Sequence, residues 1–478
     1  MSVDYKRTLL EHADSLAQKE YSARELTEAY LTQIDRIDGQ IGAYLTVTAE
    51  RALAMAAASD ARRAAGASLG LLDGIPFAVK DNICTRATRT TCASRMLADY
   101  LPPYDATVIE RLCESGAVML GKTNMDEFAM GSTGEHSAFG LTRNPADTQC
   151  MSGGSSSGSA AAVASAQAVF SLGSDTGGSV RLPAAFCGVV GMKPTYGRIS
   201  RYGLIAHASS LDQIGVLSTN VRDNAAVLAH IVGHDARDAT SAQREDRAFL
   251  PPDGCSLKGV RIGLIQQLMG EKISGEVRSA VWSAAERFRQ LGAVVSEISL
   301  PSLENAAAAY YVIACAEASS NLARFDGVRY GHRTESASTL AELYCRSRSE
   351  GFGEEVKRRI LLGTFVLSEG YAEEYYRRAM RTREAIRQEL DSAWSDVDLL
   401  LSPSAPTVAY RIGETAKLTE RYESDLCCVA ANLAGLPAIS IPCGKGRSGL
   451  PIGMQLMGRA FDEASLYRAA CAYEDSTR

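Results

Sequence analysis

The pattern of apolar and polar positions predicts that the chain begins with helices. Apolar residues recur at helical spacing behind a capping-box pair, which is Ser22 and Glu25 followed by Leu26, Tyr30, Ile34 and Ile37. An Ala- and Arg-rich stretch over residues 50–67 predicts a further helix on the surface. We therefore expect region 1–68 to be helical.

From residue 72 onward, short apolar runs alternate with helical patterns. The runs that predict strands are 77–79, 117–120, 169–172, 260–265, 294–300, 397–401 and 438–441, and the stretches that predict helices between them are 107–115, 159–168 and 275–291. The pattern over 302–396 is almost wholly helical, which indicates an insertion or cap. This alternation predicts an α/β fold, with a large mixed sheet covered by helices on both faces. We expect one large domain over 1–478.

Composition narrows the function classes. The 478 residues carry a formal net charge of -6, which argues against direct nucleic-acid binding by this chain. The twelve cysteines include no C-x-x-C pair, so no metal site is expected. No apolar run approaches the ~20 residues of a membrane helix, and no secretory signal or transit peptide is visible. We expect a cytoplasmic protein without a membrane partner.

Two serine-glycine loops and one lysine carry the candidate chemistry. The loops cover 153–159 and 173–179, and Lys80 lies in an apolar-flanked turn at 75–82. Glycines around serines permit tight backbone turns that expose N–H groups. A buried lysine can become a neutral base, because burial disfavours its charged form. Together they suggest acyl transfer by a serine nucleophile without histidine, although such loops also occur as simple connectors.

Two motif matches do not fit their surroundings. Residues 116–123 match the phosphate-binding pattern G-x-x-x-x-G-K-T, but the middle residues are Ala, Val, Met and Leu, which predict a buried strand. Residues 154–158 match a nucleophile elbow centred on Ser156, yet the polar, proline-containing approach at 143–149 predicts a loop. A hydrolase triad would also need a downstream Asp and His, and no local signature surrounds His207, His230, His234 or His332. The elbow interpretation therefore stays open but weak.

The second loop follows a predicted strand end at 171–175. Ser179 then stands close to a helix start, where unpaired N–H groups favour negative charge. The N–H groups of 176–179 could form an oxyanion hole. The alternative is a glycine turn that serves packing alone.

These segments resemble the amidase signature family. The matching pieces within 72–215 are the lysine turn, GGSSSGS, GSDTGGSVRLPA and residues 188–195. Further segments resemble the glutamyl-tRNA(Gln) amidotransferase branch of that family, namely 81–84, 90–94, 125–131, 317–322 and 324–330. The likeness covers nearly the whole chain and implies the amidase signature fold.

The resemblance implies a Ser–cis-Ser–Lys triad. Ser179 matches the family nucleophile, Ser155 the serine that follows a cis peptide bond, and Lys80 the base. The N–H groups of Thr176, Gly177 and Gly178 are the expected oxyanion hole. Lys80 must be neutral to accept a proton, although a free lysine titrates near ~10.4. Ser155 would relay the proton of Ser179 to Lys80 and return it to the leaving ammonia.

For glutamine as substrate, the resemblance points to three binding residues. Arg359 would clamp the α-carboxylate, Asp425 would pair with the α-ammonium, and Tyr310 would line the pocket. Adjacent Arg358 leaves the register open by one residue. The alternative for Arg359 and Asp425 is a pair of ordinary surface ion pairs on helices.

The sequence also departs from the usual family pattern at a few positions: residues 134–136, which include His136, residues 150–152, Ser157, Val216, Cys427 and Cys428. The triad positions are untouched, so the departures bear on substrate specificity and on coupling to a partner.

The resemblance implies a glutaminase subunit of a tRNA-dependent amidotransferase. Such a chain cleaves glutamine and passes ammonia to a tRNA- and ATP-handling partner, with a small third subunit. No cofactor is expected in this chain; ATP and Mg are expected on the partner, and tRNA contact only through it. The alternatives are a stand-alone amidase for another small amide and a catalytically silent structural subunit.

Overall fold

One large sheet organises the molecule. The computed structural model describes residues 3–244, 248–252, 254–414 and 423–477. Its sheet has eleven strands in the order β1-β3-β2-β6-β8-β7-β12-β13-β11-β9-β10. Their bounds are β1 Tyr44–Val47, β2 Pro76–Lys80, β3 Val118–Thr123, β6 Phe170–Asp175, β7 Val190–Lys193, β8 Gln213–Ser218, β9 Arg261–Ile265, β10 Val294–Ile298, β11 Leu399–Pro403, β12 Ala438–Lys445 and β13 Pro451–Met457. A separate two-stranded ribbon joins β4 Arg143–Asn144 to β5 Asp147–Met151.

The sheet is mixed, as the alternating pattern predicts. Strand β2 runs parallel to β3 and β6, and β9 runs parallel to β10 and β11. The pairs of β8 with β6 and of β12 with β13 are antiparallel. Every residue of β6 and β8 is buried. Because successive strand residues point to opposite faces, the central strands must be covered on both sides.

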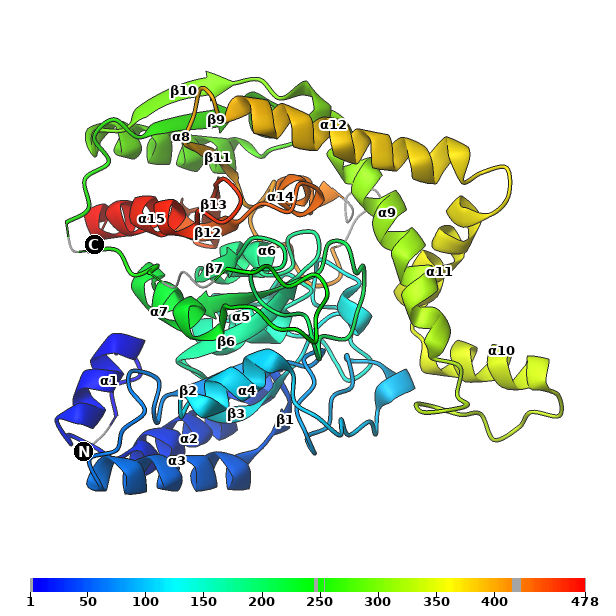
Figure 1. Cartoon of the computed structure of the whole chain (residues 1–478), viewed down its shortest axis with the longest axis horizontal. Helices are drawn as coiled ribbons and strands as arrows, with labels where there is room; N and C mark the ends of the chain where they lie inside the picture. Colours follow the sequence, from blue (N-terminus) through cyan, green and yellow to red (C-terminus); the bar gives the residue numbers. More distant parts are fainter. Residues whose placement is uncertain (1–2, 245–247, 253, 415–422, 478) are drawn as a thin grey trace.

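The cover is helical, and Figure 1 shows helices along the length of the sheet. The α-helices of the described ranges are α1 Leu9–Ala17, α2 Ala23–Ile41, α3 Ala49–Ala64, α4 Thr107–Glu114, α5 Ser157–Ala164, α6 Arg181–Cys187, α7 Val221–Ile231, α8 Gly275–Gln290, α9 Ala306–Asn321, α10 Leu340–Gly351, α11 Glu354–Leu367, α12 Arg378–Ala393, α14 Val429–Leu433 and α15 Glu463–Thr477. Short helical turns are η1 Arg95–Leu97, η2 Glu127–Ala129, η3 Gln266–Met269, η4 Pro301–Asn305, η5 Leu322–Arg324 and η6 Glu373–Arg377. Helices α5 and α6 pack on each other and on the central strands, and α7 and α15 form a second such pair.

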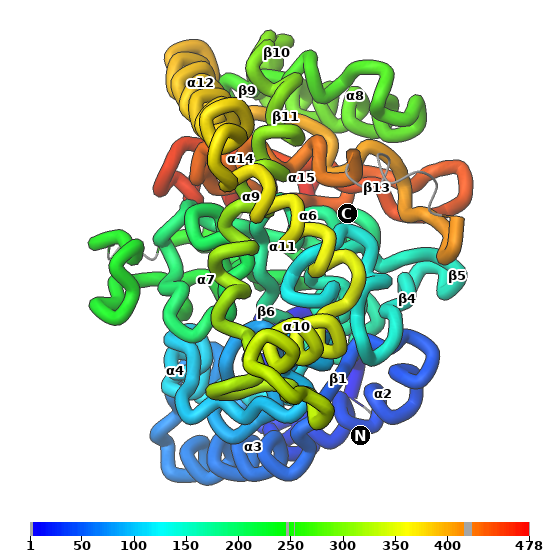
Figure 2. The backbone as a smooth tube through the Cα atoms, turned by 90° about the vertical axis from the view of Figure 1, so that its right-hand side faces the viewer, coloured from blue at the N-terminus to red at the C-terminus, as the bar shows by residue number. Residues whose placement is uncertain are grey.

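The elements from η4 to α12 form a helical arm on one side of the sheet. In Figure 1, α12 crosses the top while α9, α11 and α10 descend beside the strands. Figure 2 shows the same helices in front of the sheet, so the arm lies across the strand ends. Helix α9 packs against both α11 and α12. The described elements between Pro301 and Ala393 are helical, as the pattern over 302–396 predicts. The division into one domain with an insertion stays a prediction.

The local patterns predict many elements well, and the exceptions have physical causes. The capping box is present at Ser22, and α2 begins at the next residue. The helix predicted over 159–168 instead begins at Ser157 and ends at Ala164. The positive φ of Ala166 reverses the chain into β6 there, so residues 165–168 are not helical.

The structure shows the secondary structure of the two rejected motifs. Residues 118–123 form buried strand β3, as the apolar middle of the phosphate-loop match predicts. The prediction of a loop before Ser156 is wrong in part, because β5 covers Asp147–Met151. That strand belongs to the two-stranded ribbon and not to the main sheet, since its partner is β4.

The sheet topology brings Lys80 and the second serine-glycine loop to one edge of the sheet. Strand β2 ends at Lys80, and the neighbouring parallel strand β6 ends at Asp175. Carboxyl ends of parallel neighbours lie at the same edge, which is where ligands bind in open α/β sheets.

The described ranges lack two further features. Among the residues with assigned structure, no helix is both long and apolar enough to cross a membrane. Within the same ranges, no group of three or more His, Cys, Asp or Glu side chains could hold a metal ion.

Candidate active site

Lys80 lies at the centre of a buried cluster of hydroxyl groups. Its side chain has no exposed surface. The Nζ atom is 2.8 Å from Ser155 Oγ, 2.9 Å from Ser156 Oγ and 2.9 Å from Ser174 Oγ, and 3.1 Å from the Ser174 carbonyl oxygen. These four contacts exceed the three protons that an ammonium can donate. A neutral amine can instead accept a proton from one of the hydroxyls.

The serine loop after β5 presents Ser155 to Lys80. The peptide bond between Gly154 and Ser155 is cis, as the family resemblance implies. Gly154 donates its N–H to the Ser132 carbonyl at 2.9 Å, and Asp126 donates its N–H to the Ser155 carbonyl at 3.2 Å. A side chain at Gly154 would collide with Asp126, because an added Cβ would lie 1.9 Å from its Oδ2. Only glycine fits at this close approach.

Ser156 has a structural place beside the lysine. Its hydroxyl donates to the Ser174 carbonyl at 3.1 Å, and its N–H donates to the Ser179 carbonyl at 3.1 Å. The hydroxyl proton of Ser156 is therefore already used in the hydrogen bond to the Ser174 carbonyl. Among the described residues, the only hydrogen-bond partner of Ser155 Oγ is Lys80. Ser155 is consequently the better placed of the two to exchange a proton with Lys80.

Asp175 fixes the loop that carries Ser179. Its carboxylate accepts the N–H groups of Gly178 at 2.8 Å and of Val180 at 3.1 Å, on either side of Ser179. It also forms a fully buried ion pair with Arg181, whose Nε and Nη2 lie 3.0 Å from its two oxygens. This pairing holds the pKa of Asp175 well below its usual range despite burial.

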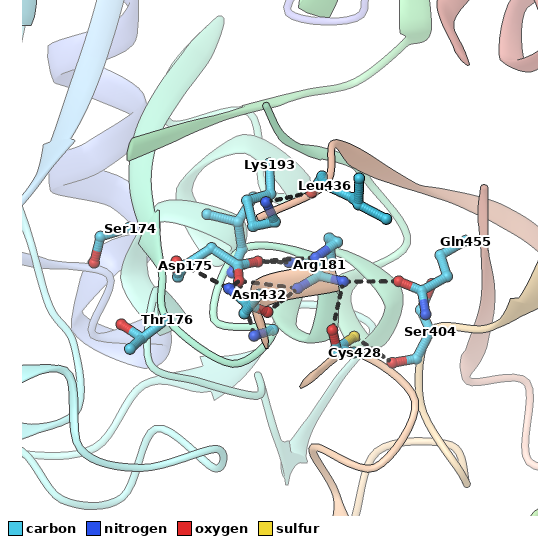
Figure 3. A network of polar contacts seen from close by, with 12 residues as sticks. Ser174, Asp175, Thr176, Arg181, Lys193, Ser404, Cys428, Asn432, Leu436 and Gln455 are labelled. Carbon is cyan, nitrogen blue, oxygen red and sulfur yellow. Dashed lines mark hydrogen bonds and ion pairs between the residues drawn. The ribbon is translucent and has the colours of Figure 1, made fainter. Parts of the chain in front are cut away.

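Figure 3 shows how far this network extends. Arg181 also donates to Asn432 Oδ1 at 2.6 Å, Gln455 Oε1 at 2.8 Å and the Cys428 carbonyl at 3.0 Å. The side chains of Ser174 and Thr176 lie on the opposite side of Asp175 from Arg181. The network therefore supports the Ser179 loop through Asp175, which accepts from the neighbours of Ser179.

The N–H groups expected to form an oxyanion hole divide into two sets. That of Gly178 is taken by Asp175. The structure gives the N–H groups of Thr176 and Gly177 no acceptor among the residues it describes. Ser179 is 7% exposed and its hydroxyl likewise has no partner in the described ranges. Unpaired N–H donors thus remain at Thr176 and Gly177 among the described residues.

Burial governs the charge of Lys80. Loss of hydration lowers its pKa from 10.5 to about 7. The carboxylates of Asp126, Asp175 and Asp212 act in the opposite direction and limit that shift. A large fraction of Lys80 is therefore neutral near pH 7, as a proton acceptor requires.

Burial distinguishes the two adjacent arginines. Arg359 is 4% exposed, and its Nε donates to Glu355 Oε1 at 2.8 Å. Its guanidinium lies over the ring of Tyr311, 5.4 Å from the ring centre. The side chain of Arg358 is 45% exposed and contacts Glu355 from outside. The surface interpretation is therefore wrong for Arg359, because its ion pair with Glu355 is buried.

Asp425 is buried as well, so the surface ion-pair interpretation is also wrong for this residue. Its carboxylate accepts from Ser132 Oγ at 2.9 Å and from the Tyr311 hydroxyl at 2.7 Å. Burial raises its pKa to about 6. Tyr311 thus connects the two substrate-binding candidates, Arg359 and Asp425. Tyr310 is the residue against the nucleophile loop, since an added Cβ at Gly177 would lie 2.5 Å from its hydroxyl oxygen.

Several of the sequence departures surround this cluster. Cys428 packs on Gly178, because a Cβ there would lie 2.6 Å from that of Cys428. The Oγ of Ser157 is buried without a partner among the described residues. His136 donates its N–H to Asp126 and lines a surface pocket that Glu127 and Arg358 also line. Lys80, Ser155 and Ser179 do not line that pocket.

Sequence reasoning missed four residues that hold the candidate site together. They are Asp126, Ser132, Ser174 and Tyr311. Ser174 lay within the second loop, and Tyr311 is the neighbour of Tyr310, so adjacency was the available signal. Asp126 and Ser132 join the site through loop contacts that no periodicity reveals.

Comparison with known proteins identifies the family. The family model for amidases matches residues 25–467. The chain is 54% identical over 477 residues to the A subunit of the glutamyl-tRNA(Gln) amidotransferase of Moorella thermoacetica, covering 99% of this chain and 97% of that protein. It is 53% identical to the protein of the same name from Thermosynechococcus vestitus, covering 97% of this chain and 96% of that protein.

Solved structures agree with the sequence comparison. The protein of the same name from Thermotoga maritima has a TM-score of 0.83 at 40% identity, covering 99% of this chain and 96% of that one. The native peptide amidase from Stenotrophomonas maltophilia has a TM-score of 0.84 at 33% identity, covering 99% and 98%.

Proposed function

The chain belongs to the amidase family, and from that premise we propose that it is the glutaminase subunit of a glutamyl-tRNA(Gln) amidotransferase. The observation that carries the chemistry is the 2.8 Å contact between Lys80 Nζ and Ser155 Oγ in a site closed to solvent. The choice of reaction rests on the glutamyl-tRNA(Gln) amidotransferase relatives, which match this chain at 53–54% identity over nearly its full length.

Acylation begins at Ser179. Neutral Lys80 accepts the hydroxyl proton of Ser155 while Ser155 accepts that of Ser179. The Ser179 oxygen attacks the carboxamide carbon of glutamine, and the carbonyl oxygen becomes an oxyanion near the N–H groups of Thr176 and Gly177. The C–N bond then breaks as the proton returns through Ser155 to the nitrogen. Ammonia leaves, and a glutamyl ester remains on Ser179.

Deacylation uses the same groups with water as nucleophile. Water attacks the ester carbon and gives a proton to Ser155, which passes one to Lys80. Collapse of the second tetrahedral intermediate breaks the bond to Ser179 Oγ, and the proton returns to that oxygen. Glutamate leaves, and the three side chains regain their starting protonation.

Arg359 and Asp425 provide opposite charges for the two ends of an amino acid backbone. The guanidinium of Arg359 suits a carboxylate, because its N–H groups can donate in parallel. Ionised Asp425 suits the α-ammonium. Tyr311 contacts both side chains and supports their spacing. Tyr310 lines the same region beside Gly177.

Ammonia is then used by a partner. The net charge of -6 favours a division of labour in which another subunit binds tRNA. In this proposal ATP and Mg act on the tRNA-handling partner, a small third subunit completes the assembly, and the complex works in the cytoplasm. No cofactor is assigned to this chain.

The test is ammonia release from glutamine by the full chain, alone and co-expressed with companion subunits encoded beside it. We expect release that rises in the complex and disappears in the variant S179A. Strong activity of the chain alone on other amides, with none on glutamine, would instead support a stand-alone amidase. Absence of both activities, with no labelling of Ser179 by a reactive glutamine analogue, would indicate a purely structural role.

A further inference from the structure

One buried histidine has no hydrogen-bond partner. His207 is 1% exposed, and neither of its ring nitrogens has a partner among the described residues. An imidazole always carries at least one N–H, and when neutral it also carries one acceptor nitrogen. Leaving such a group unpaired in the interior is energetically unfavourable. A buried, unsatisfied side chain of this kind calls for a functional explanation.

His12 shows the ordinary alternative in the same molecule. It is also fully buried, but its Nδ1 lies 2.7 Å from the Tyr21 hydroxyl and its Nε2 lies 3.2 Å from the Tyr30 hydroxyl. His12 is therefore a satisfied core histidine, and His207 is not.

The backbone places His207 between two parts of the candidate site. Ile205 donates its N–H to the carbonyl of Asn82, two residues after Lys80, at 2.9 Å. His207 donates its own N–H to Asp212 Oδ2 at 2.9 Å, and Asp212 Oδ1 accepts from Thr176 Oγ1 at 2.7 Å. The segment is thus fixed at one end to the lysine turn and at the other to the nucleophile loop.

The remaining contacts fix the main chain and leave the ring free. Helix α9 contributes Asn321, whose Nδ2 donates to the His207 carbonyl at 3.2 Å. Asn82, at the other end of the segment, also has a buried Oδ1 without a partner in the described ranges. The site therefore contains two unpaired polar groups on segments that contact each other.

The nearby charges favour a neutral ring. Burial lowers the pKa of His207 well below its usual value, and the positive charges of Arg359 and then Lys80 lower it further. Asp212, which lies against the same segment, contacts the backbone N–H of His207. A neutral imidazole can donate a hydrogen bond without adding a second positive charge to that of Arg359.

We propose that the ring N–H of His207 donates a hydrogen bond to the carboxylate of the bound substrate, in addition to the hydrogen bonds that Arg359 donates. A carboxylate offers about four acceptor positions, of which a bidentate guanidinium uses two. His207 would use another and so select amides that carry a carboxylate. This inference rests on the proposed function, because it takes glutamine as the substrate.

The first test uses three variants in the full chain co-expressed with its companion subunits. H207F removes both ring nitrogens, and we expect the KM for glutamine to rise about tenfold or more, as for loss of a hydrogen bond to a charged group. Its Tm should not fall, since no protein hydrogen bond is lost. H207Q keeps an N–H donor and should recover most of the affinity. H12F is the matched control, with a lower Tm and an unchanged KM.

The second test asks which substrate group the ring contacts. The probe is γ-aminobutyramide, which keeps the amine and carboxamide of glutamine but lacks its carboxylate, measured as a competitive inhibitor. Its Ki should be the same in the wild type and in H207F.

An unchanged KM for glutamine in H207F overturns the inference, and so does an equal loss of affinity for both amides. A wild type that releases no ammonia from glutamine defeats the proposed function first, so the two failures are distinguishable.

Discussion

The Nζ of Lys80 lies 2.8 Å from the Oγ of Ser155, and neither side chain has any exposed surface. Strand β2 brings the lysine to this point and the loop after β5 brings the serine, so the contact joins segments 75 residues apart. A lysine in this position gives up its proton more readily than one in water, because burial disfavours the ammonium.

The activity should therefore depend on pH through Lys80. With a pKa of about 7, the lysine is protonated below that pH and cannot accept a proton, so kcat/KM should rise with pH through about 7 and then level off. The measurement is ammonia release from glutamine across the pH range. K80M should remove both the activity and the rising limb.

A second buried lysine supplies the control. The pKa of Lys193 is also lowered to about 7 by burial, but its Nζ donates to the carbonyls of Pro194 and Leu436. The variant K193Q should keep the rising limb. If K193Q lost the rise of kcat/KM with pH while K80R kept it, the titrating group would be Lys193 and not Lys80.

Alanine substitutions of Ser155, Ser156 and Ser179 should differ in their effect on kcat. S179A and S155A should each lower kcat by about 10⁴- to 10⁶-fold, because residues that act as one unit lose similar activity when either is removed. S156A should cost much less, since its hydroxyl proton is committed to the Ser174 carbonyl. Rates of ammonia release and mass spectrometry of the acyl-enzyme measure this. A severe S156A with a mild S155A would transfer the relay to Ser156.

Adjacent arginines give a matched pair for substrate binding. R359K should raise the KM for glutamine about 10- to 100-fold, because lysine cannot donate in parallel to a carboxylate. R358K should change KM less than twofold, since that side chain lies at the surface. Steady-state kinetics of both variants decide the register, and an R358K effect equal to that of R359K would refute the assignment.

Asp425 should produce a separate pH effect on binding. Its pKa is raised to about 6 by burial, so it is neutral below that pH and charged above it. The KM for glutamine should fall as pH rises through about 6, while kcat should follow the titration of Lys80 near 7. D425N should abolish the change in KM. Kinetics in which KM stays constant from pH 5 to 8 would count against a contact with the α-ammonium.

The ion pair of Asp175 and Arg181 should dominate local stability. D175N leaves a buried guanidinium without its counter-charge, which costs about 3–5 kcal/mol of unfolding free energy. Chemical denaturation at neutral pH measures the loss. N432A removes one neutral partner of Arg181 and should cost much less, so equal losses in the two variants would contradict a dominant charge term.

The sequence alone determined the fold class and named the residues proposed to carry the chemistry. Apolar periodicity predicted β2, β3 and β6 because a strand buried on both faces is an unbroken apolar run. The glycine-serine loops and Lys80 suggested serine chemistry, and the resemblance to the amidase signature family gave each residue its expected role. Strands β7, β8 and β13 were not predicted, since glycines and polar residues such as Gln213 and Gln455 interrupt their patterns.

Tertiary structure decided the charges, partners and orientation of those residues. Only the packing shows that Arg359 is buried while Arg358 is not, because both occupy equivalent helical sequence. Only the packing pairs Gly178 with Asp175 and leaves the ring of His207 unpaired. Sequence determines which groups exist, whereas hydration and hydrogen bonding depend on neighbours that come from distant parts of the chain.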